Sequence, residues 1–258
     1  MHKLIITAFT AVLLAGGAAQ AKEWTKIRIG VEGAYPPFSS MTEDGELQGF
    51  DIDIAHALCA QINAECTLVP QDWDGIIPAL LARKYDAIIA SMSITEERKK
   101  KVNFTNKYYQ TPARFARRKG SGIEVSAADL KGRKVGVQRA TIHDGFLTEV
   151  FGDEVEVVRY GSQDEAYLDA VSGRLDLLMA DSVALMDGFL NTEQGGDWEF
   201  VGPPYTDVKY FGEGAGIAVR KRDNDLREQL NAAIDAIRAN GVYRQINEKY
   251  FDFDIYGN

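Results

Sequence analysis

One arginine of the sequence lies where an anionic partner would be favourable. Residues 86–100, DAIIASMSITEERKK, pass from an apolar run into hydroxyl residues and then charged ones. Ser93 and Glu96 predict a helix start with a capping box, which places Arg98 in the electropositive first turn. A guanidinium binds a carboxylate through two parallel hydrogen bonds. We interpret Arg98, with the Ser91, Ser93 and Thr95 hydroxyls and the free N–H groups of the helix start, as a carboxylate receptor. A solvated arginine heading a basic run is the alternative.

A carboxylate ends a second apolar run, LLMAD at residues 177–181. Asp181 is either the N-cap of a following helix or the counter-charge of a bound ammonium group, and one side chain can serve both roles. Ser91 ends its own apolar run in the same way, which favours a place for both residues in one cleft. Arg98 and Asp181 would then hold the two charged ends of an α-amino acid.

Two aromatic rings and a carboxylate indicate the side chain of that ligand. Tyr35 follows Glu32 by three residues, and Trp73 lies in the loop PQDWDG. Each well-placed ring attracts a cation by about 0.5 to 2 kcal/mol, so the three residues suit an aliphatic stem with a cationic head at Glu32. Core packing is the alternative for Trp73, and a turn before Pro36-Pro37 is the alternative for Tyr35.

The elements that must position these residues form two similar halves. Strand-like runs alternate with helical periodicity, which predicts an α/β fold with a mainly parallel sheet in each half. The first half reads KIRIGVE, FDIDIAHALCAQI, CTLVP, GIIPALLARK and DAIIAS, and the second reads RKVGVQ, HDGFLTEVF, EVEVVRY, QDEAYLDAVSGR and DLLMAD. Ligands of open parallel sheets bind beyond the carboxyl ends of the strands. Two lobes that face each other there would enclose a cleft.

Alignment of the halves places the candidate residues at equivalent strand ends. The aligned pairs are Gly30 with Gly136, Glu32 with Gln138, Tyr35 with Thr141, Asp86 with Asp176 and Ser91 with Asp181. Thr141 and the backbone at Ile142 open a predicted helix and can hold the ligand carboxylate from the second lobe. His143, the next residue, either donates to a ligand or faces solvent near the helix start, and we expect it to face solvent.

The chain is expected to cross between the lobes twice, which permits hinge closure over a ligand. The expected boundaries are a signal peptide at 1–21, lobe 1 at 22–110 and 214–258, lobe 2 at 114–205, and hinges at 111–113 and 206–213. The sequence of the last part of lobe 1 predicts a strand followed by two helices. Gly241 is suited to the C′ position that ends the first of these helices.

The N-terminal residues predict export to the periplasm. A basic head, an apolar run of about a dozen residues and small residues ending at Ala21 are typical of a cleaved signal peptide, because a membrane span needs roughly 20. Lys22 follows the expected cleavage site where a lipoprotein would carry cysteine. Cleavage leaves 237 residues with 28 Lys and Arg against 38 Asp and Glu, a net charge of −10. Nucleic acid is therefore not an expected partner.

Both cysteines lie close together, and six residues separate Cys59 from Cys66. This spacing does not match zinc sites, and a disulfide is favoured in an oxidising compartment, where it would contribute about 2 to 3 kcal/mol. The sequence contains no phosphate-binding loop, nucleophile elbow or metal motif. No metal and no cofactor are expected.

These motifs, taken as a set, resemble a known family. GVEGAYPPFSS, GFDIDIA, DAIIASMSIT with Arg98, KGRKVGVQRAT, GRLDLLMAD and KYFDFDIYGN, with the cysteine pair, are similar to the periplasmic polar-amino-acid-binding proteins of ABC importers. The lysine/arginine/ornithine-binding and histidine-binding proteins are the nearest in pattern, over essentially the whole mature chain. The resemblance implies a type II periplasmic-binding-protein fold, a monomer, and delivery of an amino acid to an inner-membrane ABC permease with a cytoplasmic ATPase.

The resemblance also implies roles for individual residues. Arg98, Ser93 and the backbone near Ile142 would hold the α-carboxylate, and Ser91, Asp181 and the Ala90 carbonyl would hold the α-ammonium. The complete set of expected ligand contacts is Glu32, Tyr35, Trp73, Ala90, Ser91, Met92, Ser93, Arg98, Gln138, Thr141, Ile142 and Asp181.

Three positions depart from the family pattern and leave the preferred ligand open among arginine, ornithine, lysine and histidine. Glu32 stands where aspartate is usual, Gln138 where an apolar residue is frequent and Ala140 where glycine is frequent. An opine, which is a larger arginine-derived conjugate, is an alternative ligand. A periplasmic cyclohexadienyl dehydratase of similar fold is the rival from another class, but its dianionic substrates lack the cationic head that Glu32 suits. We expect a binding protein and no enzymatic activity.

Overall fold

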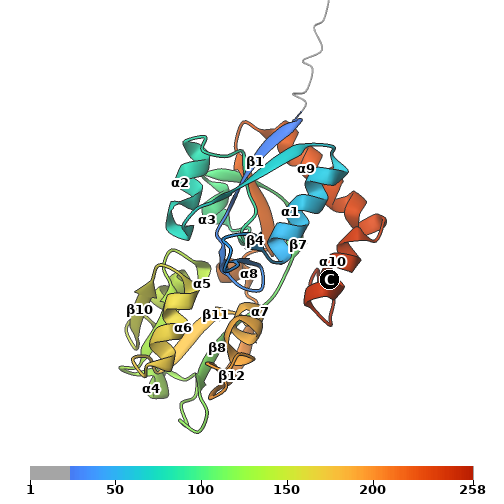
Figure 1. The fold of residues 1–258 in the computed structure, drawn as a ribbon. Coiled ribbons are helices and arrows are strands. Elements are labelled where there is room, and N and C mark those ends of the chain that lie inside the picture. The colour runs from blue at the N-terminus through green and yellow to red at the C-terminus, as the bar shows by residue number, and fades with distance from the viewer. Residues whose placement is uncertain (1–23, 258) are drawn as a thin grey trace, which may run out of the picture.

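The chain folds into two lobes, one above the other in Figure 1, joined by two crossing segments. The computed structural model describes residues 24–257, so the expected signal peptide and its cleavage after Ala21 lie outside the described residues. Among residues 24–257, no helix has both the length and the apolar character that a bilayer crossing requires. The expected α/β fold with two lobes is confirmed.

Lobe 1 is built on a five-stranded sheet. Its strands lie in the order β5 (Glu65–Pro70), β1 (Lys26–Val31), β6 (Ala87–Ile88), β13 (Ala215–Arg220) and β7 (Val102–Tyr109). The first three strands are parallel, whereas β13 runs antiparallel to both of its neighbours. The sheet is therefore mixed, because the strand that returns from the second crossing enters it in the opposite direction.

Helices cover both faces of this sheet, since alternate side chains of its strands are buried on opposite sides. One face packs against α1 (Phe50–Gln61), α9 (Asn224–Ala239) and α10 (Val242–Tyr250). The other face packs against the short helical segments η1 (Trp73–Gly75), α2 (Ile76–Leu81) and α3 (Glu96–Lys99). A small sheet adds β2 (Ala34–Tyr35), β3 (Ser39–Met41) and β4 (Leu47–Gln48). Gly241 separates α9 from α10 with a φ of +86°, as expected.

Lobe 2 repeats the strand pattern. Its order is β10 (Glu156–Tyr160), β9 (Lys134–Gln138), β11 (Leu177–Asp181), β8 (Ala113–Arg118) and β12 (Trp198–Tyr205), and its fourth strand is again antiparallel. Its helices are α4 (Ala127–Leu130), α5 (Ile142–Phe151), α6 (Gln163–Val171), α7 (Ser182–Leu185), the π-helical turn η2 (Met186–Leu190) and α8 (Val208–Phe211).

The alignment of the two halves is confirmed at the level of single hydrogen bonds. Asp86 Oδ2 accepts a hydrogen bond from the backbone N–H of Arg28 at 3.2 Å. Asp176 Oδ2 accepts the equivalent bond from the N–H of Lys134 at 2.9 Å. Asp86 immediately precedes β6, the strand that leads to Ser91, and Asp176 immediately precedes β11, which ends at Asp181. Each aspartate thus fixes the start of the strand that follows it.

The two crossings differ in length. The first is the short segment between the end of β7 at Tyr109 and the start of β8 at Ala113. The second runs from β12 to β13 and contains α8, which packs on α5, with Phe211 in the core of lobe 2. Hinge motion at these segments stays a prediction.

The predicted helix start at Ser93 is wrong. Ser93 pairs as an isolated bridge with Ala215, so its backbone is extended rather than helical. The helix begins after Thr95, whose hydroxyl accepts a hydrogen bond from the Arg98 N–H at 3.3 Å. Pairing with a strand from the far end of the chain therefore outweighed the local capping signal.

The disulfide between Cys59 and Cys66 is confirmed, and it joins the last turn of α1 to β5. Replacing both cysteines with serine should lower the free energy of unfolding by about 2 to 3 kcal/mol, because the unfolded chain loses a constraint. Denaturant unfolding of the oxidised wild type and the double variant measures the difference. An unchanged midpoint would contradict this, and reduced wild type is the matched control.

Candidate functional site

Two adjoining cavities lie between the lobes. The first, which we call the Glu32 cavity, comprises about 320 Å³ of space, part of which is open to solvent. The second, the hinge-side cavity, comprises about 520 Å³, again with part of it open to solvent. Five residues line both: Tyr35, Ser91, Ser93, Ile142 and His143.

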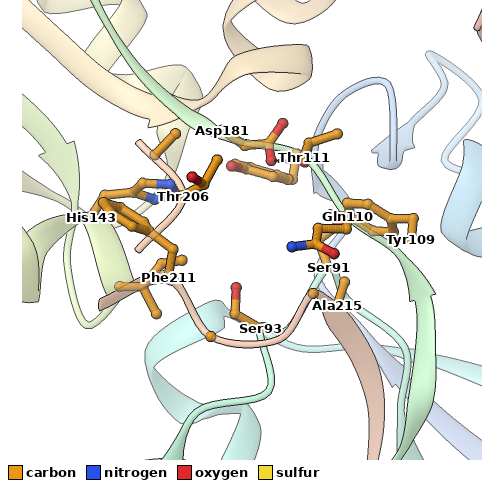
Figure 2. A pocket seen from close by; sticks show the side chains of 15 residues that line it. Ser91, Ser93, Tyr109, Gln110, Thr111, His143, Asp181, Thr206, Phe211 and Ala215 are labelled. Atoms are coloured by element: carbon orange, nitrogen blue, oxygen red, sulfur yellow. Dashed lines mark hydrogen bonds between the residues drawn. The ribbon is translucent and has the colours of Figure 1, made fainter. Parts of the chain in front are cut away.

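The Glu32 cavity brings together ten of the twelve expected ligand contacts. They are Glu32, Tyr35, Trp73, Ala90, Ser91, Ser93, Arg98, Gln138, Thr141 and Ile142. Asp181 lines the hinge-side cavity instead, and Figure 2 shows it with Thr111 at the end opposite Ser93. Met92 differs from the others because its side chain is 1% exposed in the core of lobe 1 and lines neither cavity.

Arg98 enters the cleft from α3 in lobe 1. Its Nη1 donates to the Ser93 carbonyl at 3.0 Å, and its guanidinium carbon lies 5.1 Å from the centre of the Trp73 ring. Burial lowers the pKa of Arg98 to about 10, so the group is still charged at neutral pH. Within residues 24–257 no ion pair joins it to a carboxylate. A half-buried cation of this kind is stabilised by an anion that enters the cleft.

Trp73 belongs to lobe 1 and also contacts lobe 2. It is buried among the apolar residues of lobe 1, which is the packing role considered from the sequence. Its indole N–H also donates across the cleft to the carbonyl of Ala140 at 3.2 Å, and its ring lines the Glu32 cavity. Core packing and cleft lining therefore coexist in one side chain.

Asp181 ends β11 and caps α7. Its Oδ1 accepts hydrogen bonds from the N–H groups of Val183 at 2.8 Å and Ala184 at 3.3 Å, and its Oδ2 accepts one from the Thr111 hydroxyl. Burial raises the pKa of Asp181 to about 6, because desolvation disfavours the ionised form. The N-cap role and a position on the cleft wall are thus both present.

Glu32 follows the last residue of β1 and meets the other lobe. Its Oε1 accepts a hydrogen bond from Nε2 of Gln138, the aligned residue at the end of β9. Burial raises the pKa of Glu32 to about 7. A cation placed beside this carboxylate would lower its pKa and favour ionisation.

Asp51 was not predicted from the sequence, yet it positions a predicted residue. It lies in the first turn of α1, is 0% exposed, and accepts hydrogen bonds from the Ser91 hydroxyl at 2.9 Å and the Tyr108 hydroxyl at 2.8 Å. Burial raises the pKa of Asp51 to about 7. Ser91 also adopts a left-handed φ of +52°, which is uncommon for a residue other than glycine. An acidic residue in a first helical turn is common, so the sequence carried no distinct signal for Asp51.

The expectation that His143 faces solvent is wrong. Its side chain is 7% exposed and lines both cavities from the first turn of α5, and Figure 2 shows it at the wall of the hinge-side cavity. Burial, with a smaller contribution from the charge of Arg98, lowers the pKa of His143 to about 3. The imidazole is therefore neutral at physiological pH.

The cleft as a whole combines charges of both signs on different elements. Lobe 1 supplies Arg98 and Glu32, and lobe 2 supplies Asp181. Such an arrangement can hold a small molecule with one anionic and two cationic groups, provided that the lobes exclude water around it.

Comparisons with known proteins agree with this arrangement. Residues 27–253 match the model of bacterial extracellular solute-binding proteins, family 3. The chain is 58% identical to the L-arginine-binding protein of Pseudomonas aeruginosa and 46% identical to the histidine-binding periplasmic protein of Salmonella typhimurium, over 90% of each chain in both cases. A solved ancestral arginine-binding protein bound to arginine has a TM-score of 0.82 at 35% identity, covering 89% of this chain and 100% of that chain. This chain belongs to the bacterial extracellular solute-binding proteins of family 3.

Proposed function

We propose that the protein captures a cationic L-amino acid between its lobes in the periplasm and delivers it to an ABC permease in the inner membrane. One observation carries the proposal: the cleft contains one cation, Arg98, and two carboxylates, Glu32 and Asp181. These charges complement the one carboxylate and two cationic groups of a basic amino acid. Relatives named for binding arginine and histidine support the same ligand class. The proposed ligand class comprises arginine, ornithine, lysine and histidine, without an order of affinity among them.

The α-carboxylate is assigned to Arg98, Ser93 and the backbone N–H of Ile142. Ile142 is the first residue of α5, so its N–H has no partner within the helix, and the helix dipole favours an anion there. Thr141 caps this helix by accepting the N–H of Asp144 at 3.2 Å, and its hydroxyl donates to the Gln138 carbonyl at 2.8 Å. These two hydrogen bonds of Thr141 fix the start of α5 and with it the direction of the Ile142 N–H.

The α-ammonium is assigned to Asp181, Ser91 and the Ala90 carbonyl. The Ser91 hydroxyl donates its only hydrogen to Asp51, so its lone pairs remain as acceptors for an ammonium group. Asp51 would thus act as a positioning residue. Replacing it would leave the Ser91 hydroxyl free to rotate and to present a hydrogen toward the ligand cation.

The side chain of the ligand is assigned to the Glu32 cavity. Tyr35 and Trp73 would pack against its aliphatic stem, and Glu32 would bind its cationic head. Both lobes then touch one ligand, so ligand binding favours the closed arrangement by the difference in affinity between closed and open forms.

The proposed role includes no chemical step. The dianionic substrates of cyclohexadienyl dehydratases would place a second carboxylate beside Glu32, where like charges repel. Incubation with prephenate or arogenate should therefore yield neither phenylpyruvate nor phenylalanine. Appearance of either product would overturn the proposal of a binding protein.

Calorimetric titration of purified, ligand-stripped protein tests the ligand class. Basic amino acids should bind with dissociation constants at least about tenfold lower than those of glutamate, leucine and glutamine, because only they bring two cations to two carboxylates. Equal affinity for neutral and basic amino acids would contradict the proposal.

Removing the cleft arginine should weaken binding of every amino acid. Arg98→Ala should cost about 1.5 to 3 kcal/mol or more, the typical contribution of charged hydrogen bonds, whereas Glu32→Gln should mainly reduce the preference for cationic side chains. Lys99→Ala is the matched control, since Lys99 pairs with Glu96 and Glu213 outside both cavities. Unchanged affinity in both cleft variants would reject the assignment of the site.

Affinity for a cationic amino acid should rise with pH. Burial raises the pKa of Glu32 to about 7 and that of Asp181 to about 6, and the ligand binds their ionised forms. Lowering the pH from 8 to 5.5 should therefore weaken binding at least about tenfold, and association at pH 7 should release protons. Calorimetry in two buffers of different ionisation enthalpy measures that release. Proton uptake at pH 7 would contradict the predicted sign.

A further inference from the structure

We propose that Gln138 is a specificity determinant of this cleft: together with Glu32 it forms a paired acceptor that favours a guanidinium head over an ammonium head. The inference rests on the proposed function, since it selects among the cationic amino acids. Gln138 lines the Glu32 cavity from the end of β9, opposite Glu32 of the other lobe.

The orientation of the Gln138 amide is fixed by its neighbours. The side chain is 2% exposed, and its Nε2 donates to Glu32 Oε1 from the opposite lobe and to the carbonyl of Gly161 at 3.3 Å. Both neighbours are acceptors, so the nitrogen rather than the oxygen of the amide has to face them. Both amide hydrogens are engaged in this way, and the amide oxygen points elsewhere.

Two oxygens of this pair remain available to a ligand. In the described part of the chain no group donates a hydrogen bond to Gln138 Oε1 or Glu32 Oε2, and neither atom is among the buried polar atoms without a partner. Both residues line the Glu32 cavity. The two oxygens are therefore accessible from the cavity, one anionic from lobe 1 and one neutral from lobe 2.

A guanidinium fits such a pair better than an ammonium does. Its five N–H donors lie in one rigid plane, so it can donate to two oxygens at once while its face stacks on an aromatic ring. An ammonium is a compact, strongly hydrated charge on a flexible stem, and it gains most of its stabilisation from Glu32 alone. Because Gln138 belongs to lobe 2, only the guanidinium head adds a bond that also holds the lobes together.

The test compares arginine with lysine and ornithine by calorimetry on wild type, Gln138→Leu and Arg139→Ala. Gln138→Leu removes the amide and leaves an apolar side chain that branches one atom closer to the backbone. It should raise the dissociation constant for arginine about tenfold or more and those for lysine and ornithine less than about threefold, as expected for a lost bond to a charged group.

Arg139→Ala is the matched control from the adjacent position. Arg139 reaches the opposite lobe through Asp74, with Nε 2.7 Å from Oδ2, but it lines neither cavity. It should change the affinity for all three ligands by the same small factor, because the ion pair is solvent-exposed. Circular dichroism and thermal unfolding show whether each variant is folded.

Three outcomes would overturn the inference and leave the proposed function intact: equal losses for arginine and lysine in Gln138→Leu, no loss for arginine, or a wild-type preference for lysine over arginine. Failure of the wild type to bind any basic amino acid would overturn the proposed function, and this inference with it.

Discussion

Desolvated charge is the constraint on which the cleft depends. Arg98, Glu32 and Asp181 are all held away from bulk water, and in the described part of the chain none of them is neutralised by another. Keeping unpaired charges in a region of low dielectric costs free energy, which appears as shifted pKa values. A ligand of complementary charge recovers that free energy, so the cost of building the site is also the source of its affinity.

The repeated architecture explains how the two lobes come to share one ligand. Aligned strands of each sheet end at the cleft, and each lobe contributes two polar ends, Glu32 and Ser91 from one and Gln138 and Asp181 from the other. The positions are equivalent, but the residue types are not. Because the acidic residue is Glu32 in one pair and Asp181 in the other, the two carboxylates line different cavities of the cleft.

The fold and most of the candidate site could be predicted because both depend on local patterns. Apolar periodicity fixed the strands, and the polar residues at their ends line the cavities. The failures depend on contacts distant in sequence: Asp51 meets a serine 40 residues away, and Ser93 is drawn into an extended bridge by Ala215. His143 faces the cleft because the first turn of α5 lies at the cavity wall. Met92 faces the core because successive side chains of an extended segment point to opposite sides.

The position of β13 within lobe 1 has a consequence for biosynthesis. This strand lies between β6 and β7 although it follows the whole of lobe 2 in the chain. A ribosome therefore completes lobe 2 before the central gap of the first sheet can be filled. Until residues 215–220 have been made, the facing edges of β6 and β7 lack the strand that pairs with both of them, so the first sheet cannot be completed.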